Sequence, residues 1–136
     1  KTCTLPERVQ GICPDGWHLP TRSEWYTLKT TVEEIFSAEK LSGGTILKSQ
    51  TGWSSGCYSK KCNGTDSFGF SGLPGGYKDK YGNFLEAVDG SGAFFWSASE
   101  YQEDKVTILN LSYDSDYATL AHKLKSSAYS VRCVKD

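Results

Sequence analysis

The pattern of apolar positions predicts one amphipathic helix near the start of the chain. Apolar residues recur there at spacings of three, four and three, which places them on one face of an α-helix. Thr21 and Glu24 stand in the arrangement of a capping box, in which each side chain bonds the backbone N–H of the other residue. We expect the helix to begin after Thr21 and to end before Gly43. Its apolar stripe consists of Trp25, Leu28, Val32 and Ile35.

The last third of the chain alternates apolar and polar residues, which is typical of half-buried β-strands. We expect strands over residues 93–99, 105–113, 117–124 and 128–134. Short polar turns separate the last three of these strands, so they should form an antiparallel meander. The alternation places Leu109, Leu111 and Tyr113 on one face of the strand 105–113.

Residues 42–92 show neither a helical nor a strand period. This stretch is rich in Gly, Ser, Asn and Asp, with aromatic residues set between them. A loop of this length is unusual inside a compact domain unless function or specific packing holds it. We expect buried aromatic side chains on a tightly folded backbone over residues 67–77, and a turn between two short strands at residues 81–84.

Composition limits the possible classes of protein. The 136 residues suit one domain, and 15 Lys+Arg against 16 Asp+Glu leave a net charge of −1. This balance argues against binding to nucleic acid or to an anionic membrane surface, both of which require a concentrated basic surface. No apolar run is long enough to span a bilayer. Aromatic residues make up 13% of the chain, which excludes a disordered protein.

The five cysteines allow either disulfides or a metal site. Cys57 and Cys62 have a spacing that zinc tolerates, but there is no second close pair, and the two histidines are isolated. We therefore expect disulfides, with Cys57–Cys62 closing a small polar loop and Cys13–Cys133 closing almost the whole domain. Cys3 is then either a free thiol or the partner of a cysteine outside this chain.

Four segments carry a resemblance to a known family. They read GICPDGWHLPT at residues 11–21, GTDSFGFSGLPGGY at 64–77, FWSASE at 95–100 and SVRCVKD at 130–136. In order and spacing they resemble the Fibrobacter succinogenes major paralogous domain, and together they span nearly the whole chain. The resemblance implies an α+β fold similar to C-type lectins and to sulfatase-modifying proteins. It also implies an exported or surface-attached bacterial protein, with adhesion as a common suggestion for the family's function.

The family pattern includes a further segment before the Cys-Pro-x-Gly-Trp block, and this chain begins close to that block. We therefore expect a single C-type-lectin-like domain over residues 1–136 that lacks the family's upstream segment. Within the family blocks we expect aromatic side chains to form the core. These are Trp17, Trp25, Trp53, Trp96, Phe68, Phe70 and Phe95.

Catalytic and metal sites are not indicated by the sequence. His18 lies between Trp17 and Leu19 in a block that we expect to be packed, so we interpret it as a structural histidine. A glycosidase would need two convergent carboxylates, and nothing in the sequence pairs two of them. The oxygen ligands of calcium-dependent lectins are missing from the Trp96 strand. We expect no catalytic residue, no metal and no cofactor.

The sequence nevertheless suggests a ligand-binding surface. Tyr101 follows the Trp96 strand, and Asp114, Asp116 and Tyr117 surround one hairpin turn. Tyrosines beside polar groups are typical of surfaces that stack on sugars or bind proteins. We expect these four residues to bind a polysaccharide or a surface protein without catalysis and without metal. The rest of the parent chain is a further candidate partner of the domain. The alternatives are a structural or assembly domain of a larger surface protein or filament and, less favoured, an enzyme whose site is assembled from scattered carboxylates.

Overall fold

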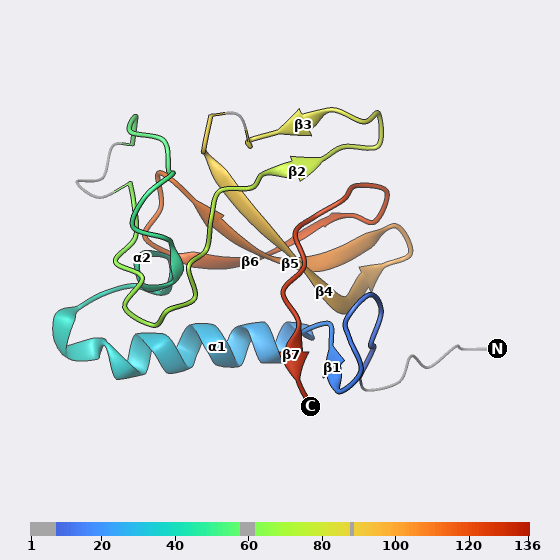
Figure 1. The fold of residues 1–136 in the computed structure, drawn as a ribbon, viewed down its shortest axis with the longest axis horizontal. Coiled ribbons are helices and arrows are strands. Elements are labelled where there is room, and N and C mark those ends of the chain that lie inside the picture. Colours follow the sequence, from blue (N-terminus) through green and yellow to red (C-terminus); the bar gives the residue numbers. More distant parts are fainter. Residues whose placement is uncertain (1–7, 58–61, 88) are drawn as a thin grey trace.

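The computed structural model describes residues 8–57, 62–87 and 89–136, so Cys3 lies outside the described residues. The fold is mixed α+β, with a three-stranded antiparallel sheet between the helix α1 on one side and a small hairpin on the other (Figure 1). In chain order the elements are β1 (Trp17–His18), α1 (Arg22–Ile35), η1 (Ser37–Glu39), α2 (Gly43–Leu47), β2 (Tyr77–Lys78), β3 (Phe84–Leu85), β4 (Gly92–Gln102), β5 (Lys105–Ser112), β6 (Ala118–Leu124) and β7 (Val134–Lys135). No helix within these described ranges is long and apolar enough to cross a membrane.

The helix α1 begins at the capping box that the sequence predicts. The backbone N–H of Glu24 donates to Thr21 Oγ1 at 3.2 Å, and the Thr21 N–H donates to Glu24 Oε2 at 2.8 Å. Trp25 and Val32 are buried as expected. The expectation for Ile35 is wrong, because its side chain is 58% exposed. The helix ends at this residue, and Phe36 packs against the core in its place.

The central sheet has the order β4-β5-β6 and two different faces. On the inner face Phe95 pairs with Leu109, which pairs with Leu120, and these side chains join Trp25 and Val32 of α1 in the main core. On the outer face Phe94 and Ile108 form a second apolar cluster. The period-two alternation of the strands thus supplies apolar side chains to both faces.

Residues 128–134 do not form the last strand of the meander, so this prediction is wrong. The meander consists of β4, β5 and β6, and the segment after β6 crosses the outer face instead. The Tyr129 ring stacks there on Trp96 with centroids 5.4 Å apart and also meets Tyr77 of the β2–β3 hairpin. Backbone bonds from Ser130 to β4 and from Ala128 to β2 hold the same segment. The chain then reaches β7, which pairs with β1 at the opposite end of the sequence.

The irregular middle region contains a short helix that the sequence does not predict. All five residues of α2 are buried, so they show no amphipathic period. A Cβ atom at Gly44 would lie 2.7 Å from the backbone of Asp116 and Tyr117, so only glycine lets α2 approach the β5–β6 hairpin this closely. The expected short strands around residues 81–84 are confirmed as β2 and β3.

Both predicted disulfides are confirmed. Cys13 and Cys133 are bridged with Cα atoms 5.9 Å apart, and Cys57 and Cys62 with Cα atoms 5.5 Å apart. The first bridge joins the segment before β1 to the segment before β7, so it fastens the two ends of the fold together. The second joins two cysteines that lie five positions apart in the middle region.

Candidate functional site

The four predicted ligand residues lie at the two ends of the sheet. Tyr101 belongs to the end of β4, where Gln102 pairs with Lys105, whereas Asp114, Asp116 and Tyr117 lie in the hairpin between β5 and β6. At about 3.3 Å per residue, β5 separates the two hairpins by roughly 20 Å. The prediction of one joint site is therefore wrong in its geometry, because a strand within a meander holds its two hairpins at opposite ends. Binding at either hairpin alone stays a prediction.

Tyr101 forms a stack on the sheet surface. Its ring lies parallel to the imidazole of His122, with centroids 3.5 Å apart and an angle of 7° between the planes. The Tyr101 side chain is 53% exposed. This pair presents a flat surface to solvent, but the groups of the β5–β6 hairpin are too distant to complete it.

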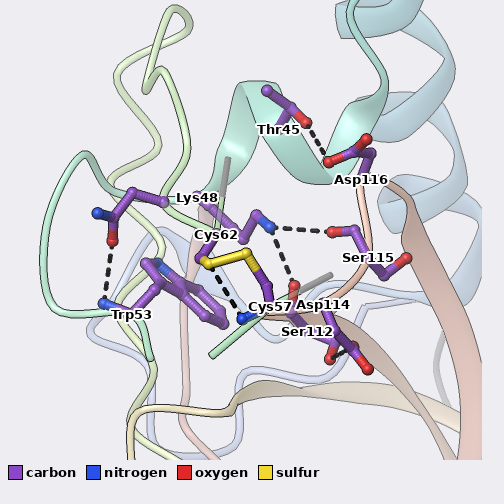
Figure 2. The surroundings of a disulfide bond; sticks show 10 residues. Thr45, Lys48, Trp53, Cys57, Cys62, Ser112, Asp114, Ser115 and Asp116 are labelled. Carbon is purple, nitrogen blue, oxygen red and sulfur yellow. Dashed lines mark hydrogen bonds between the residues drawn. A yellow bond between two sulfur atoms is a disulfide. The ribbon is translucent and has the colours of Figure 1, made fainter. Parts of the chain in front are cut away.

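The β5–β6 hairpin is fixed from inside by a buried lysine (Figure 2). Lys48 is fully buried, and its Nζ donates to the carbonyl oxygens of Ser112 at 3.0 Å and Ser115 at 2.9 Å. Burial lowers the pKa of Lys48, while the charges of Asp116 and Asp114 oppose this effect. The hairpin acids therefore act as electrostatic partners of Lys48, a role that sequence reasoning missed.

One further side-chain contact ties this hairpin to the middle region, and Trp53 packs against Lys48 within that region. Thr45 Oγ1 of α2 donates to Asp116 Oδ1 at 3.2 Å (Figure 2). Trp53 lies below Lys48 Nζ, 5.4 Å from the ring centroid, and its backbone N–H donates to Asn63 Oδ1 at 3.1 Å. Figure 2 shows the Cys57–Cys62 bridge beside this group. Packing inside the fold thus accounts for the position of the Asp116 carboxylate.

A groove lies between α1 and residues 132–135. It has a volume of about 460 Å³ and a largely apolar lining. We call it the α1 groove. Its apolar side chains are those of Trp17, Pro20, Trp25, Leu28, Phe70 and Val134. Trp17 is 39% exposed, so the expectation that it is a core residue is wrong, and its ring is available to a ligand in the groove.

Two basic residues border the α1 groove. Arg132 Nη2 donates to the carbonyl oxygen of Phe70 at 2.8 Å, and the guanidinium lies over the Phe70 ring, 4.5 Å from its centroid. Lys135 of β7 also lines the groove, and both basic residues are exposed. A ligand in the groove would therefore meet an apolar surface with positive charge at its border.

The wall of the groove is held in place by a buried histidine. His18 is 2% exposed. Its Nδ1 lies 2.6 Å from Asp136 Oδ1, and its Nε2 lies 2.8 Å from Glu24 Oε1. One ring thus joins the end of the chain, beside β7, to the first turn of α1. Burial and the engagement of both ring nitrogens agree with the interpretation of His18 as a structural histidine, which stays a prediction.

The electrostatics of this cluster favour the charged forms of His18 and Glu24. The hydrogen bond to Glu24 raises the pKa of His18 above its ordinary value of 6.5, and the bond to Asp136 adds to this, although burial opposes it. Burial raises the pKa of Glu24, but the Thr21 N–H and the His18 ring outweigh it and hold that pKa below the ordinary value of 4.5. The charged forms of His18 and Glu24 thus stabilise each other in this cluster.

The model of the Fibrobacter succinogenes major domain matches residues 6–135 of the chain. The chain belongs to this family. No curated protein and no solved structure matches it. The family resemblance drawn from the four sequence blocks is thereby confirmed, and all four blocks lie at least in part within the matched range.

In this Fibrobacter major domain, three of the family blocks meet at the α1 groove. Trp17 and Pro20 come from the first, Phe70 from the second and residues 132–135 from the last. Sequence reasoning assigned these aromatic residues to the core and so missed the groove. One sequence feature pointed to the groove: Pro20, Trp25 and Leu28 stand close to Trp17 around the start of a helix. Nothing in the pattern placed residues 132–135 beside them.

Other surfaces of the domain carry less chemistry. The β2–β3 hairpin exposes 78% of Tyr81 and 64% of Phe84, and the ammonium groups of Lys80 and Lys78 lie over these rings. Phe68 is 45% exposed, so its assignment to the core is also wrong. Over residues 8–57, 62–87 and 89–136, no three or more His, Cys, Asp and Glu side chains are grouped so that they could hold a metal ion.

Proposed function

We propose that this domain is a non-catalytic recognition module of an exported bacterial protein, and that it binds its ligand in the α1 groove. The observation that carries the proposal is the groove itself, in which the exposed ring of Trp17 and the side chain of Leu28 lie beside Arg132 and Lys135. Apolar concave surfaces with a few polar groups at the border are typical of ligand sites. Two disulfides support export, because such bridges persist in oxidising compartments.

The rigidity of the groove wall supports the same function. The Cys13–Cys133 bridge, the β1–β7 pairing and the contacts of His18 all fix the segment that forms this wall. A preformed site loses little conformational entropy when a ligand binds, which favours recognition. The proposal includes a C-type-lectin-like architecture, which is supported by one long helix, a long irregular region and the pairing of the first strand with the last.

The assembly alternative has a specific observation in its favour. Tyr81 and Phe84 are large, exposed and close together on the β2–β3 hairpin, so a second subunit could cover them. Under that alternative the hairpin rather than the groove forms the contact. The two proposals therefore differ in which surface a substitution must disrupt.

The proposal is tested by filling the groove. Thr27 is exposed on α1 and lines the groove, whereas Thr31 is exposed on the same helix and does not line it. Thr27→Trp and Thr31→Trp thus add the same ring at two positions. Both variants and the parent would be screened on a glycan array and against a phage-displayed library of ten-residue peptides. We expect Thr27→Trp to abolish capture and Thr31→Trp to retain it. Equal capture by both variants would reject the groove as the site.

A further inference from the structure

The outer edge of β7 carries backbone groups that bond to no other backbone group among the described residues. The Asp136 N–H donates to the Gly16 carbonyl oxygen at 3.0 Å, which makes Trp17–Lys135 a non-hydrogen-bonded pair of the antiparallel β1–β7 ladder. In such a pair the residues' own N–H and C=O groups point away from the partner strand. Lys135 and, two residues earlier, Cys133 therefore direct these groups away from β1. Among the described residues no backbone group outside the ladder bonds to them.

This free edge borders the α1 groove. Residues 132–135 line the groove together with Trp25 and Leu28 of α1. In Figure 1, β7 lies over the beginning of α1, with β1 on one side of it and the rest of the helix on the other. A chain segment laid along the free edge would thus run over the apolar lining.

We propose that the α1 groove takes an extended segment of a partner polypeptide, which adds as a strand to the edge of β7, inserts an apolar side chain beside Leu28 and pairs a carboxylate with Arg132 or Lys135. This inference rests on the proposed function and names its ligand class. Strand addition to an open edge is a recurring mode of peptide recognition, in which backbone bonds supply affinity and pockets for alternate side chains supply specificity.

The lining favours a polypeptide over a sugar. A saccharide in the groove would bring hydroxyls against apolar side chains, where they lack hydrogen-bond partners. An extended peptide instead directs its backbone groups to the strand edge, while alternate side chains point into the groove. The free edge of β7 can bond the peptide backbone, and the apolar lining next to it can take the peptide side chains.

The charges of the groove favour an acidic partner. Glu24, the acid that lines the groove, already pairs with His18. Within the described part of the chain neither Arg132 nor Lys135 has an ion pair. The uncompensated charge at the groove is thus positive, so carboxylates are the complementary groups.

The test separates the backbone bond from the charge at one position. Lys135→Pro removes both the charge and the outward N–H, and it breaks no bond of the β1–β7 ladder, because that N–H points away from β1. Lys135→Gln removes the charge alone. The probe is the phage-displayed ten-residue library selected on the wild-type domain, and the enriched peptides are then synthesised and titrated by calorimetry against each variant.

We expect the enriched peptides to combine an apolar residue with acidic neighbours. Lys135→Gln and Arg132→Gln should each weaken binding about two- to fivefold, because each loses one charge contact. Lys135→Pro should weaken binding about tenfold or more, because it loses a backbone hydrogen bond as well as the charge contact. Methylation of alternate backbone nitrogens of the peptide should also weaken binding to the wild type, because it removes the peptide N–H groups that bond to the edge of β7. Equal affinities for Lys135→Pro and Lys135→Gln, or enrichment of basic peptides, would overturn the inference.

The remaining outcomes distinguish the inference from the proposed function. If Thr27→Trp abolishes peptide binding and Lys135→Pro leaves it unchanged, the proposed function stands and strand addition is overturned. The same conclusion holds if the groove captures glycans in place of peptides. Self-association that Lys135→Pro abolishes makes a second copy of the chain the occupant, which overturns the acidic partner. If neither peptides nor glycans bind at the groove, both proposals fall.

Discussion

His18 and Asp136 lie 118 positions apart in sequence, yet imidazole Nδ1 and carboxylate Oδ1 are 2.6 Å apart. With Glu24 on the other ring nitrogen, this contact connects the end of the chain to the start of α1. The groove proposed as the binding site lies between these same two segments, so its shape depends on a contact that only the folded chain can make.

Replacement of His18 should therefore destabilise the domain. His18→Ala removes the partner of two carboxylates and leaves a cavity, so the free energy of unfolding should fall by about 1–3 kcal/mol. This loss of stability is small because both carboxylates are partly exposed to solvent, which weakens their interaction with His18. Urea unfolding under oxidising conditions measures it. The matched control is Lys125→Gln, which breaks the exposed pair with Glu100 and should change stability by less than about 0.5 kcal/mol.

The same cluster predicts a pH dependence with two limbs. The pKa of His18 is raised in the folded state, so its contribution to stability is complete below pH 6.5 and is lost as pH rises through the folded pKa. The pKa of Glu24 is lowered, so its contribution is present above pH 4.5 and is lost as pH falls through its folded pKa. The cluster should therefore stabilise the fold most between these two values. Urea midpoints measured across pH 3–9 should show both limbs for the wild type, and an unchanged alkaline limb in His18→Ala would contradict this assignment.

The two disulfides should differ in their effect on stability. The Cys13–Cys133 bridge closes a separation of 120 residues and the Cys57–Cys62 bridge one of five. In the chain-entropy account these bridges contribute about 5 and about 2 kcal/mol respectively. Cys13→Ser/Cys133→Ser should therefore lower the urea midpoint far more than Cys57→Ser/Cys62→Ser. Similar midpoints for the two double variants would show that the long bridge does not hold the ends of the fold.

The capping box offers a local test of α1. Thr21→Ala removes the acceptor of the Glu24 N–H and should cost about 1 kcal/mol, whereas Thr21→Ser should cost little because serine keeps that acceptor. Thermal melts of the two variants make the comparison. If both lose the same stability, the hydroxyl is not the capping group.

The parts of the fold that sequence reasoning predicted are those in which local chemistry decides the structure. Thr21 and Glu24 cap α1 through contacts three residues apart, and the alternation around Leu109 and Leu111 is a property of one strand. The failures occur where a distant partner decides. Gly43 and Gly44 indicate the end of a helix, yet they begin α2 because the β5–β6 hairpin packs against them.

The site was less predictable than the fold for the same reason. Alternation over residues 128–134 shows which side chains point inward but does not show what they meet, so the segment that forms the groove wall was placed in the meander. Trp17 is large and aromatic and lies in a family block, and nothing in that pattern reveals that 39% of it stays exposed. Tyr101 lies at the end of β4 and Tyr117 just before β6, so the length of β5 separates them.

The central claim is that the α1 groove is where the ligand binds, and NMR titration tests it most directly. The ¹⁵N-labelled domain would be titrated with the tightest peptide or glycan from the two screens, and the backbone amide and indole shifts would be followed. We predict that the largest changes occur at Trp17, Leu28 and Lys135, with the amides of Tyr101 and Tyr117 unaffected. Changes confined to Tyr101, to the hairpin at Asp114–Tyr117 or to Tyr81 and Phe84, with a silent groove, would contradict the account.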